Sequence, residues 1–205
     1  MVYKRYQQPE ARAVLALIAI NIILFIATLV HRNLVGTLGL TPDTWTSAPW
    51  TLLTSMFIHG GTNDIIYNLL HIAANMFTLY FVGSYLCNMV GTARFLTVYF
   101  VGGIIGNFFY ILFSLYTPLG DPLATVIGAS GAIFAVAGAF MMLAPKMKVM
   151  VIPIPVPMPL WVAIIGGFLL MSFFPGVAWQ AHLGGLLTGI IAGYILKKRR
   201  KYILL

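Results

Sequence analysis

The sequence predicts an all-α, polytopic membrane protein: a bundle of six transmembrane helices with both termini in the cytoplasm. Of its 205 residues, 60% are hydrophobic and 8% are charged, and the mean hydropathy is +0.96. Soluble domains carry about 25% charged residues, so a water-soluble globular protein is excluded. The apolar residues form long continuous runs, as in membrane helices, instead of the alternating pattern of membrane barrels. The few basic residues fall almost entirely between alternate runs.

The apolar runs are predicted to cross the bilayer in order along the chain. Each except the fifth is long enough to cross about 30 Å of hydrocarbon as a helix. The six runs are 13–30, 65–86, 95–116, 125–143, 160–174 and 179–196. We interpret the first as a retained span and not a cleaved signal peptide, because it is long for a signal's apolar region and no A-x-A site follows it.

The basic residues predict the orientation of these spans. Arg32 alone falls on one side of the membrane; the other side holds Lys4, Arg5, Arg12, Arg94, Lys146, Lys148, Lys197, Lys198, Arg199, Arg200 and Lys201. Positive residues concentrate in cytoplasmic loops, so we expect a multi-pass protein of the plasma membrane with cytoplasmic N- and C-termini. Residues 1–205 then form one membrane domain with short tails at about 1–12 and 197–205. The net charge of +8 reflects topology, and no nucleic-acid partner is expected.

Two connecting segments are unusual. The outer segment 31–64 is long, carries Trp45 and Trp50, and contains enough apolar residues to lie in or on the outer leaflet. The inner segment 149–159 has proline at every second position from Pro153 to Pro159, which prevents a helix and favours an extended chain. No internal repeat is visible, which disfavours the common transporter architectures.

Polar side chains inside the spans are costly and are therefore candidate functional residues. Spans 2, 4 and 6 all run from outside to inside. At 1.5 Å per residue, Ser130 lies about 8 Å deep, His182 about 5 Å and His71 about 9 Å, with Asn75 about 6 Å deeper. Ser130, His182 and His71 thus fall in one shallow layer near the outer surface, and they meet if the three helices are neighbours.

Stripes of small residues predict that the fourth and sixth helices approach closely. They comprise Gly128, Gly131, Ala135 and Gly138 in one run and Ala181, Gly185, Gly189 and Gly193 in the other. A close contact would bring Ser130 within hydrogen-bond distance of His182. Such stripes are also ordinary membrane packing, so they do not by themselves indicate chemistry.

The scarcity of acidic residues restricts the chemistry. The four carboxylates lie outside the span cores, at Glu10, Asp43, Asp64 and Asp121. A serine needs an adjacent base to act as a nucleophile, and an imidazole can serve. The composition thus permits a Ser130–His182 dyad and disfavours a triad. His71, Asn75 and the backbone N–H of Ser130 could donate to a developing oxyanion.

The same polar residues also have purely structural explanations. A lone serine in a membrane helix usually bonds to a carbonyl one turn earlier, and a buried histidine is often a structural residue or a member of a proton relay. No third ligand shares the layer, so a zinc site is not expected. Cys87, the single cysteine, is expected to be inert. The remaining polar span residues are expected to be structural: Asn68, Thr78, Asn107, Ser114, Ser172 and Thr188.

Four sequence elements together resemble the rhomboid family of intramembrane serine proteases, over about residues 50–193. They are Phe57-Ile58-His59, His71-Ile72-Ala73-Ala74-Asn75-Met76, Gly128-Ala129-Ser130-Gly131 and Ala181-His182-Leu183-Gly184-Gly185 with Gly189. The resemblance implies the basic six-span prokaryotic form. It also implies that Ser130 is the nucleophile and His182 the general base, and that His71, Asn75 and the Ser130 N–H form the oxyanion hole.

The resemblance has further implications. Phe134 stands where a tyrosine often packs against the base histidine, and structural roles fall to His59, Gly128, Gly131, Gly185 and Gly189. Span 5 and the loop 175–178 would be a mobile gate and cap. No cofactor or metal is implied, and the partners are transmembrane protein substrates and the lipid bilayer, with the oligomeric state unknown. The segment between His59 and His71 is longer than the family pattern.

Two other functions remain open from the sequence. A catalytically silent rhomboid-like protein would bind membrane clients, although the intact Ser130 and His182 argue against it. A small transporter would line a path with His71, Asn75 and His182, but it needs polar residues in the inner halves of the spans as well. The inner halves of spans 4 and 6 are nearly all apolar or small.

Overall fold

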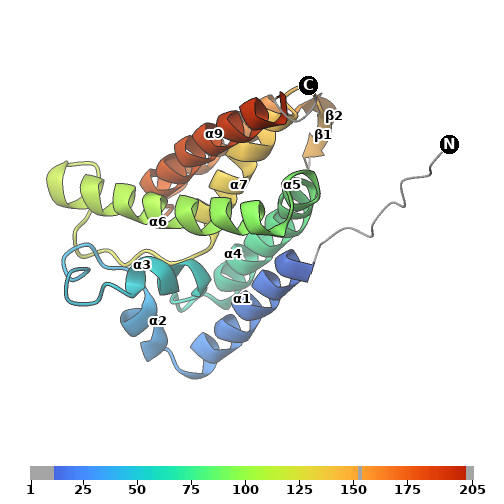
Figure 1. Ribbon diagram of the computed structural model, residues 1–205. Helices are drawn as coiled ribbons and strands as arrows, with labels where there is room; N and C mark the ends of the chain where they lie inside the picture. Colours follow the sequence, from blue (N-terminus) through green and yellow to red (C-terminus); the bar gives the residue numbers. More distant parts are fainter. Residues whose placement is uncertain (1–11, 152–153, 202–205) are drawn as a thin grey trace.

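The computed structural model describes residues 12–151 and 154–201, and this part of the chain is almost entirely helical (Figure 1). The tail residues 1–11 and 202–205 lie outside the described residues. The helices are α1 (Arg12–Val30), α2 (Asn33–Leu38), α3 (Thr51–Thr54), η1 (Ser55–Phe57), α4 (Ile65–Thr78), η2 (Leu79–Gly83), α5 (Ser84–Val90), α6 (Thr92–Tyr116), α7 (Ser130–Leu143), α8 (Leu160–Ser172) and α9 (Trp179–Lys201).

Three helical stretches are long and apolar enough to cross a membrane: α1, the continuous stretch 65–90 and α6. The stretch 65–90 joins α4 to α5 through η2, a π-helical turn. Helices α7 and α8 are apolar but shorter. All six apolar runs of the sequence contain a helix, so the predicted all-α character is confirmed, while the number of membrane crossings stays a prediction.

The predicted start of the fourth run is wrong. Helix α7 begins at Ser130 and not near residue 125. The preceding residues are held in an extended path, because Val126 forms an isolated β-bridge with Leu40. Gly128 then turns the chain with a φ of +114°, in the left-handed region that favours glycine. Ser130 is therefore the first residue of a helix, where the sequence predicted a residue five positions inside one.

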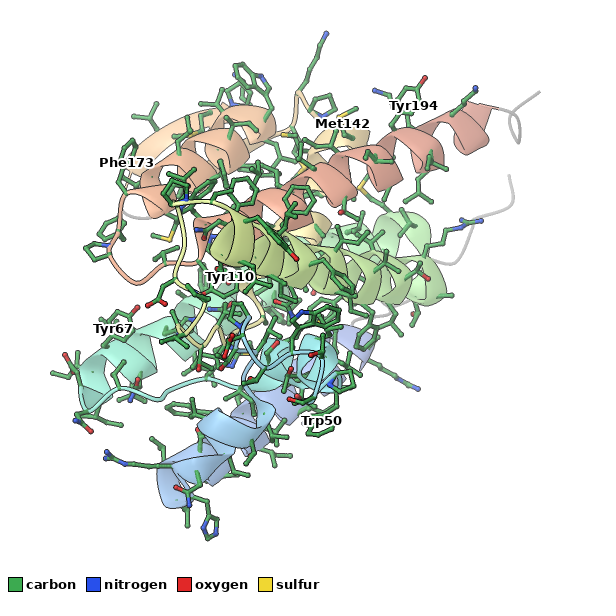
Figure 2. The ribbon with its side chains drawn as sticks, turned by 90° about the vertical axis from the view of Figure 1, so that its left-hand side faces the viewer. Trp50, Tyr67, Tyr110, Met142, Phe173 and Tyr194 are labelled. Atoms are coloured by element: carbon green, nitrogen blue, oxygen red, sulfur yellow. The ribbon has the colours of Figure 1, made fainter. Side chains whose placement is uncertain are left out.

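The outer segment 31–64 is more structured and more buried than predicted. It contains α2, α3 and η1, and two of its apolar side chains, Leu40 and Met56, are buried inside the protein and not on its surface. Trp50 is 53% exposed, as expected for a side chain at a membrane interface (Figure 2). Its indole Nε1 donates to the Thr37 carbonyl oxygen at 3.1 Å, which ties α3 to α2.

The proline-rich inner segment is extended, as predicted. Strands β1 (Lys148–Val151) and β2 (Ile154–Pro159) pair antiparallel, with Lys148 opposite Pro159. Figure 1 places this hairpin at the same end of the molecule as the start of α1 and the end of α9, whereas α2 and α3 lie at the opposite end. Among the described residues, the basic positions of α1, α6, the hairpin and α9 share the hairpin end, and Arg32 precedes α2 at the other.

Helices α6, α7 and α9 pack together through glycines, and Figure 1 shows α6 crossing beside the other two. A Cβ atom on Gly106 of α6 would stand 2.6 Å from the Ala181 carbonyl oxygen of α9. A Cβ on Gly138 of α7 would stand 2.7 Å from the Leu186 carbonyl oxygen. Real Cβ atoms do not approach backbone this closely, so the three helices pack backbone to backbone. The predicted close contact of the fourth and sixth apolar runs is confirmed.

Candidate active site

Ser130 and His182 meet where the first turns of α7 and α9 cross. The His182 Nε2 lies 2.7 Å from the Ser130 Oγ, which is hydrogen-bond distance. His182 is 5% exposed and sits in the first turn of α9, while Ser130 is half-buried. The structure thus brings together the two residues that the sequence placed in one layer. A nucleophile and a base in direct contact are the first requirement of covalent acyl transfer.

The His182 ring is held by an aromatic contact. Phe134, one turn after Ser130 on α7, stacks on it with a ring-centroid distance of 4.6 Å and an interplanar angle of 31°. Phe168 of α8 in turn meets Phe134 edge-on at 5.9 Å. The packing of Phe134 against the histidine occurs as expected, and it covers one face of the imidazole.

No carboxylate among the described residues orients the imidazole. The His182 Nδ1 is buried and has no hydrogen-bond partner in the described part of the chain. In a triad this nitrogen would donate to an acidic side chain. In the described part of the chain, Ser130 and His182 are therefore in contact without an acidic side chain bonded to the imidazole.

The backbone around Ser130 can stabilise a negative charge. As the first residue of α7, Ser130 presents an N–H that the helix itself does not use, at the positive end of the helix dipole. His71 of α4 lies beside it: the His71 Nε2 would be 2.9 Å from a Cβ on Gly128. Any side chain at position 128 would collide with this imidazole, so glycine is required there for its space and for its φ.

Asn75 lies one turn further along α4. Its Nδ2 donates to the His71 carbonyl oxygen at 2.9 Å, and its buried Oδ1 has no partner among the described residues. An amide nitrogen carries two hydrogens, so one N–H of Asn75 remains to donate elsewhere. The structure therefore places His71 beside Gly128, in the loop that precedes Ser130, and bonds Asn75 to the His71 backbone.

His59 contacts the loop that precedes Ser130, at Ala129. It is fully buried, its Nε2 faces the Ala129 backbone N–H at 3.4 Å, and its ring lies 5.1 Å from that of His71. The Thr28 hydroxyl donates to the His59 carbonyl oxygen at 2.8 Å. The family resemblance implied a structural role for His59, and the structure supplies a contact for it: the imidazole accepts from the N–H of Ala129, the residue before Ser130.

We expect His59 to make the fold sensitive to acid. Burial, with a smaller contribution from the charge of His71, lowers the pKa of His59 to about 3, whereas an unfolded chain has a histidine pKa of about 6.5. Between these values the unfolded state binds the extra proton, so stability falls as pH drops below about 6.5. Thermal unfolding in detergent from pH 7.5 to 4.5 measures this slope, and His59→Gln should flatten it. An equal slope in the variant would assign the acid sensitivity to other groups.

A second support for this loop was missed by the sequence analysis. The Gly128 N–H donates to the Ser55 carbonyl oxygen at 2.9 Å. The Asn107 Nδ2 of α6 donates to the Ser55 Oγ at 2.9 Å and to the Leu52 carbonyl oxygen at 2.8 Å. Asn107 is structural, as expected, but nothing in the sequence marks Ser55 as its partner, because the two residues lie 52 positions apart.

The long segment between His59 and His71 is largely helix. Asp64 caps α4 by accepting hydrogen bonds from the N–H groups of Ile66 and Tyr67 at 2.9 and 3.1 Å. Residues 65–70 therefore extend α4 beyond His71 toward the α2 end of the molecule, and Figure 2 shows Tyr67 on this extension. The residues by which this segment exceeds the family pattern therefore lengthen the start of α4 and do not include Ser130 or His182.

Comparisons with a family model and with individual proteins point to the same family. A family model described as the rhomboid domain matches residues 46–199. The chain is 32% identical over 136 residues to Rhomboid protein 1, mitochondrial, of Saccharomyces cerevisiae, covering 62% of this chain and 38% of that protein. It is 29% identical over 169 residues to Putative rhomboid protease YdcA of Bacillus subtilis, covering 80% and 75%. It is 32% identical over 150 residues to Rhomboid protease GluP of the same bacterium, covering 72% and 26%.

Proposed function

The chain belongs to the rhomboid family of intramembrane proteases, and we propose that it cleaves transmembrane proteins near the outer membrane face with a Ser130–His182 dyad. The observation that carries the proposal is the 2.7 Å contact between the Ser130 Oγ and the His182 Nε2. The stacking of Phe134 on the imidazole and the support of the preceding loop by His59 favour a site built for catalysis over a chance contact of two polar residues.

The reaction follows from these two groups. The Ser130 Oγ attacks the carbonyl carbon of the substrate while its proton passes to the His182 Nε2. The tetrahedral intermediate collapses, the peptide C–N bond breaks, and the proton on Nε2 passes to the departing amine. Water then attacks the acyl-enzyme with His182 again acting as base, which releases the acid and restores the serine.

The oxyanion of each intermediate needs donors. We assign this role to the Ser130 backbone N–H, the His71 imidazole and the free N–H of Asn75. Two features support it: Ser130 begins a helix, and the His71 Nε2 lies beside the Gly128 backbone. One such donor contributes about 10²–10³-fold to turnover in other acyl-transfer enzymes.

We also propose the topology that the sequence predicts. The chain forms one membrane domain with six spans in the plasma membrane and both termini in the cytoplasm. The described basic positions at the hairpin end support this orientation, because positive residues are retained on the cytoplasmic side. In that orientation the dyad lies near the outer face.

An active-site-directed probe tests the proposal. A fluorophosphonate reacts with a serine only where a base activates it, so it should label the purified wild-type protein and should fail to label Ser130→Ala and His182→Ala. Ser84→Ala is the matched control, because Ser84 is also half-buried and its buried hydroxyl has no partner in the described structure. Equal labelling of Ser130→Ala, or no labelling of folded wild-type protein, would contradict the dyad and would favour a silent binding protein.

We expect Asn75→Ala to lower kcat about 10²-fold, with little change in KM, because an oxyanion donor acts mainly in the transition state. Steady-state cleavage of a reconstituted single-span substrate measures both constants.

Asn21→Ala is the control for that substitution. Asn21 of α1 makes the same local bond, from Nδ2 to the Leu17 carbonyl oxygen at 2.7 Å, and it also has a buried, unpartnered Oδ1. Both variants lose the same local bond to the carbonyl oxygen one turn earlier, but only Asn75 is bonded to His71, whose ring lies beside Gly128. Similar kcat values for the two variants would show that Asn75 is structural.

A further inference from the structure

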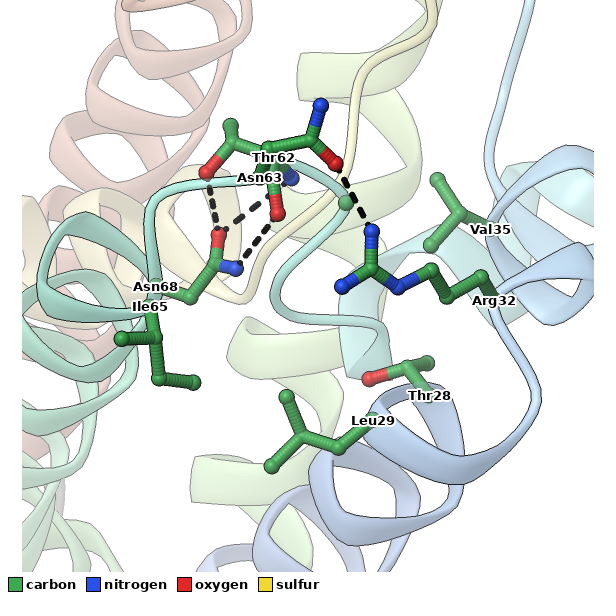
Figure 3. A pocket seen from close by; sticks show the side chains of 9 residues that line it. Thr28, Leu29, Arg32, Val35, Thr62, Asn63, Ile65 and Asn68 are labelled. Carbon is green, nitrogen blue, oxygen red and sulfur yellow. Dashed lines mark hydrogen bonds between the residues drawn. The ribbon is translucent and has the colours of Figure 1, made fainter.

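A polar pocket of about 80 Å³ lies between the end of α1 and the segment that leads into α4. Figure 3 shows the polar groups of Thr62, Asn63 and Arg32 on one side of the pocket and the apolar side chains of Leu29 and Ile65 on the other. None of the residues assigned to the dyad or the oxyanion hole lines it. The pocket is therefore separate from the proposed chemistry.

Arg32 is the charged group of this pocket. Its Nη1 donates to the Asn63 Oδ1 at 2.7 Å, which leaves most of the five guanidinium N–H groups available. No described residue forms an ion pair with Arg32. The neighbouring carboxylate, Asp64, instead accepts from the backbone N–H groups of Ile66 and Tyr67. The pocket thus holds a positive charge that has no negative partner in the described part of the chain.

The polar wall of the pocket is preorganised. The Asn68 Nδ2 donates to the Thr62 carbonyl oxygen at 2.9 Å, and the Thr62 hydroxyl donates to the Asn68 Oδ1 at 2.8 Å. These bonds fix the turn that carries Asn63, which in turn orients the guanidinium. A guanidinium held in one geometry binds a tetrahedral oxyanion at lower entropic cost than a free arginine side chain.

The pocket lies at the level where a lipid headgroup would be. The apolar helix α1 ends at Val30, and the polar sequence His31-Arg32-Asn33 follows, so the bilayer surface crosses the chain at this point. Below the pocket, both flanking helices expose apolar side chains: Ile26 is 56% and Leu29 43% exposed on α1, and Ile66 is 66% and Leu69 49% exposed on α4. A cationic polar pocket therefore joins directly to an apolar surface.

We propose that this pocket binds the phosphate group of a membrane phospholipid, whose acyl chains lie along the exposed faces of α1 and α4. A phosphate supplies the negative charge that is missing beside Arg32. It also accepts two parallel N–H bonds from a guanidinium. The apolar side chains below it select a lipid over a free anion. The inference does not depend on proteolysis, because the residues and the readout are independent of the dyad.

Native mass spectrometry of the detergent-purified protein tests the binding. Titration with phosphatidylglycerol should show one tightly held lipid on wild-type protein, and Arg32→Gln should weaken its retention about tenfold, as expected for loss of charge-assisted hydrogen bonds. Arg94→Gln is the matched control: Arg94 lies near the start of α6, at the opposite end of the molecule, and caps the Val90 carbonyl oxygen. Unchanged binding by Arg32→Gln, or an equal loss in both variants, overturns the proposal.

Competition experiments identify the ligand, and a second variant controls for misfolding of Arg32→Gln. Diacylglycerol, which lacks the phosphate, should not compete with phosphatidylglycerol, and inorganic phosphate at equal concentration should not displace it. Displacement by inorganic phosphate would overturn the lipid assignment in favour of a free anion. Leu29→Trp keeps the charge but occupies the apolar side of the pocket, so it should also weaken retention. Unchanged retention in folded Leu29→Trp would contradict the lipid, whatever the folding state of Arg32→Gln.

Discussion

Replacing either Ser130 or His182 with alanine is expected to lower kcat/KM for a single-span substrate by about 10⁴-fold or more, and replacing both should lower it little further. The two side chains act as one unit through their 2.7 Å contact. Without the base, the serine hydroxyl keeps its proton and is a poor nucleophile. Without the serine, the base has no proton to take. Cleavage rates of the two single variants and the double variant in proteoliposomes measure this non-additivity.

The size of the residual rate is informative too. With the dyad removed, the remaining donors at Ser130 N–H, His71 and Asn75 still stabilise an oxyanion, and in other serine proteases such donors leave about 10³-fold rate enhancement over water. Independent effects that multiply in the double variant would contradict a dyad. Full activity in His182→Ala would assign the base to another residue.

The contact between Ser130 and His182 could be anticipated from the sequence, because counting residues along α4 and α9 gives the depth of His71 and His182. His71 and His182 lie six and three residues from the starts of α4 and α9, as the apolar runs indicated. The small-residue stripes then predicted which helices meet. The absence of acidic residues from the apolar runs is the reason why a dyad, and not a triad, stays the prediction.

The start of α7 could not be predicted in the same way. Residues 125–129 are as apolar as the helix that follows, so hydropathy continues across the boundary. The extended path is set by partners distant in the sequence: Leu40 bridges Val126, and Ser55 accepts from the Gly128 N–H. A glycine in an apolar run signals a possible turn, but only these contacts show that Gly128 takes a positive φ.

The burial of the outer segment 31–64 inside the protein could not be predicted, for a related reason. Leu40 and Met56 are apolar residues in a loop at the membrane surface, and composition does not distinguish burial in lipid from burial in protein. In the structure both are almost completely buried among other side chains. The Met56 side chain packs against α6, where a Cβ on Gly103 would collide with it. The same segment reaches the site through His59 and Ser55, so its burial is part of what holds the nucleophile's loop.

The second large effect is expected at Gly185, where a single methyl group should destabilise the fold and strongly lower activity. A Cβ at this position would overlap the Gly131 carbonyl oxygen of α7, and backbone atoms cannot rotate away as a side chain can. The helices must therefore separate. Overpacking of a close-packed core typically costs about 1–3 kcal/mol, and for Gly185→Ala we expect a loss at the upper end of this range, measured as a lower unfolding temperature in detergent.

Activity should fall further than stability in Gly185→Ala, because the dyad spans the same two helices. A separation of about 1 Å at such a site costs about 10²-fold in rate. Gly167→Ala is the matched control: a Cβ on Gly167 of α8 meets nothing within 4 Å, so the same chemical change should be neutral or slightly stabilising, since alanine is the better helix former. Equal stability of the two variants would mean that α7 and α9 tolerate a wider spacing than the structure has. Normal turnover in a destabilised Gly185→Ala would mean that the dyad does not depend on that spacing.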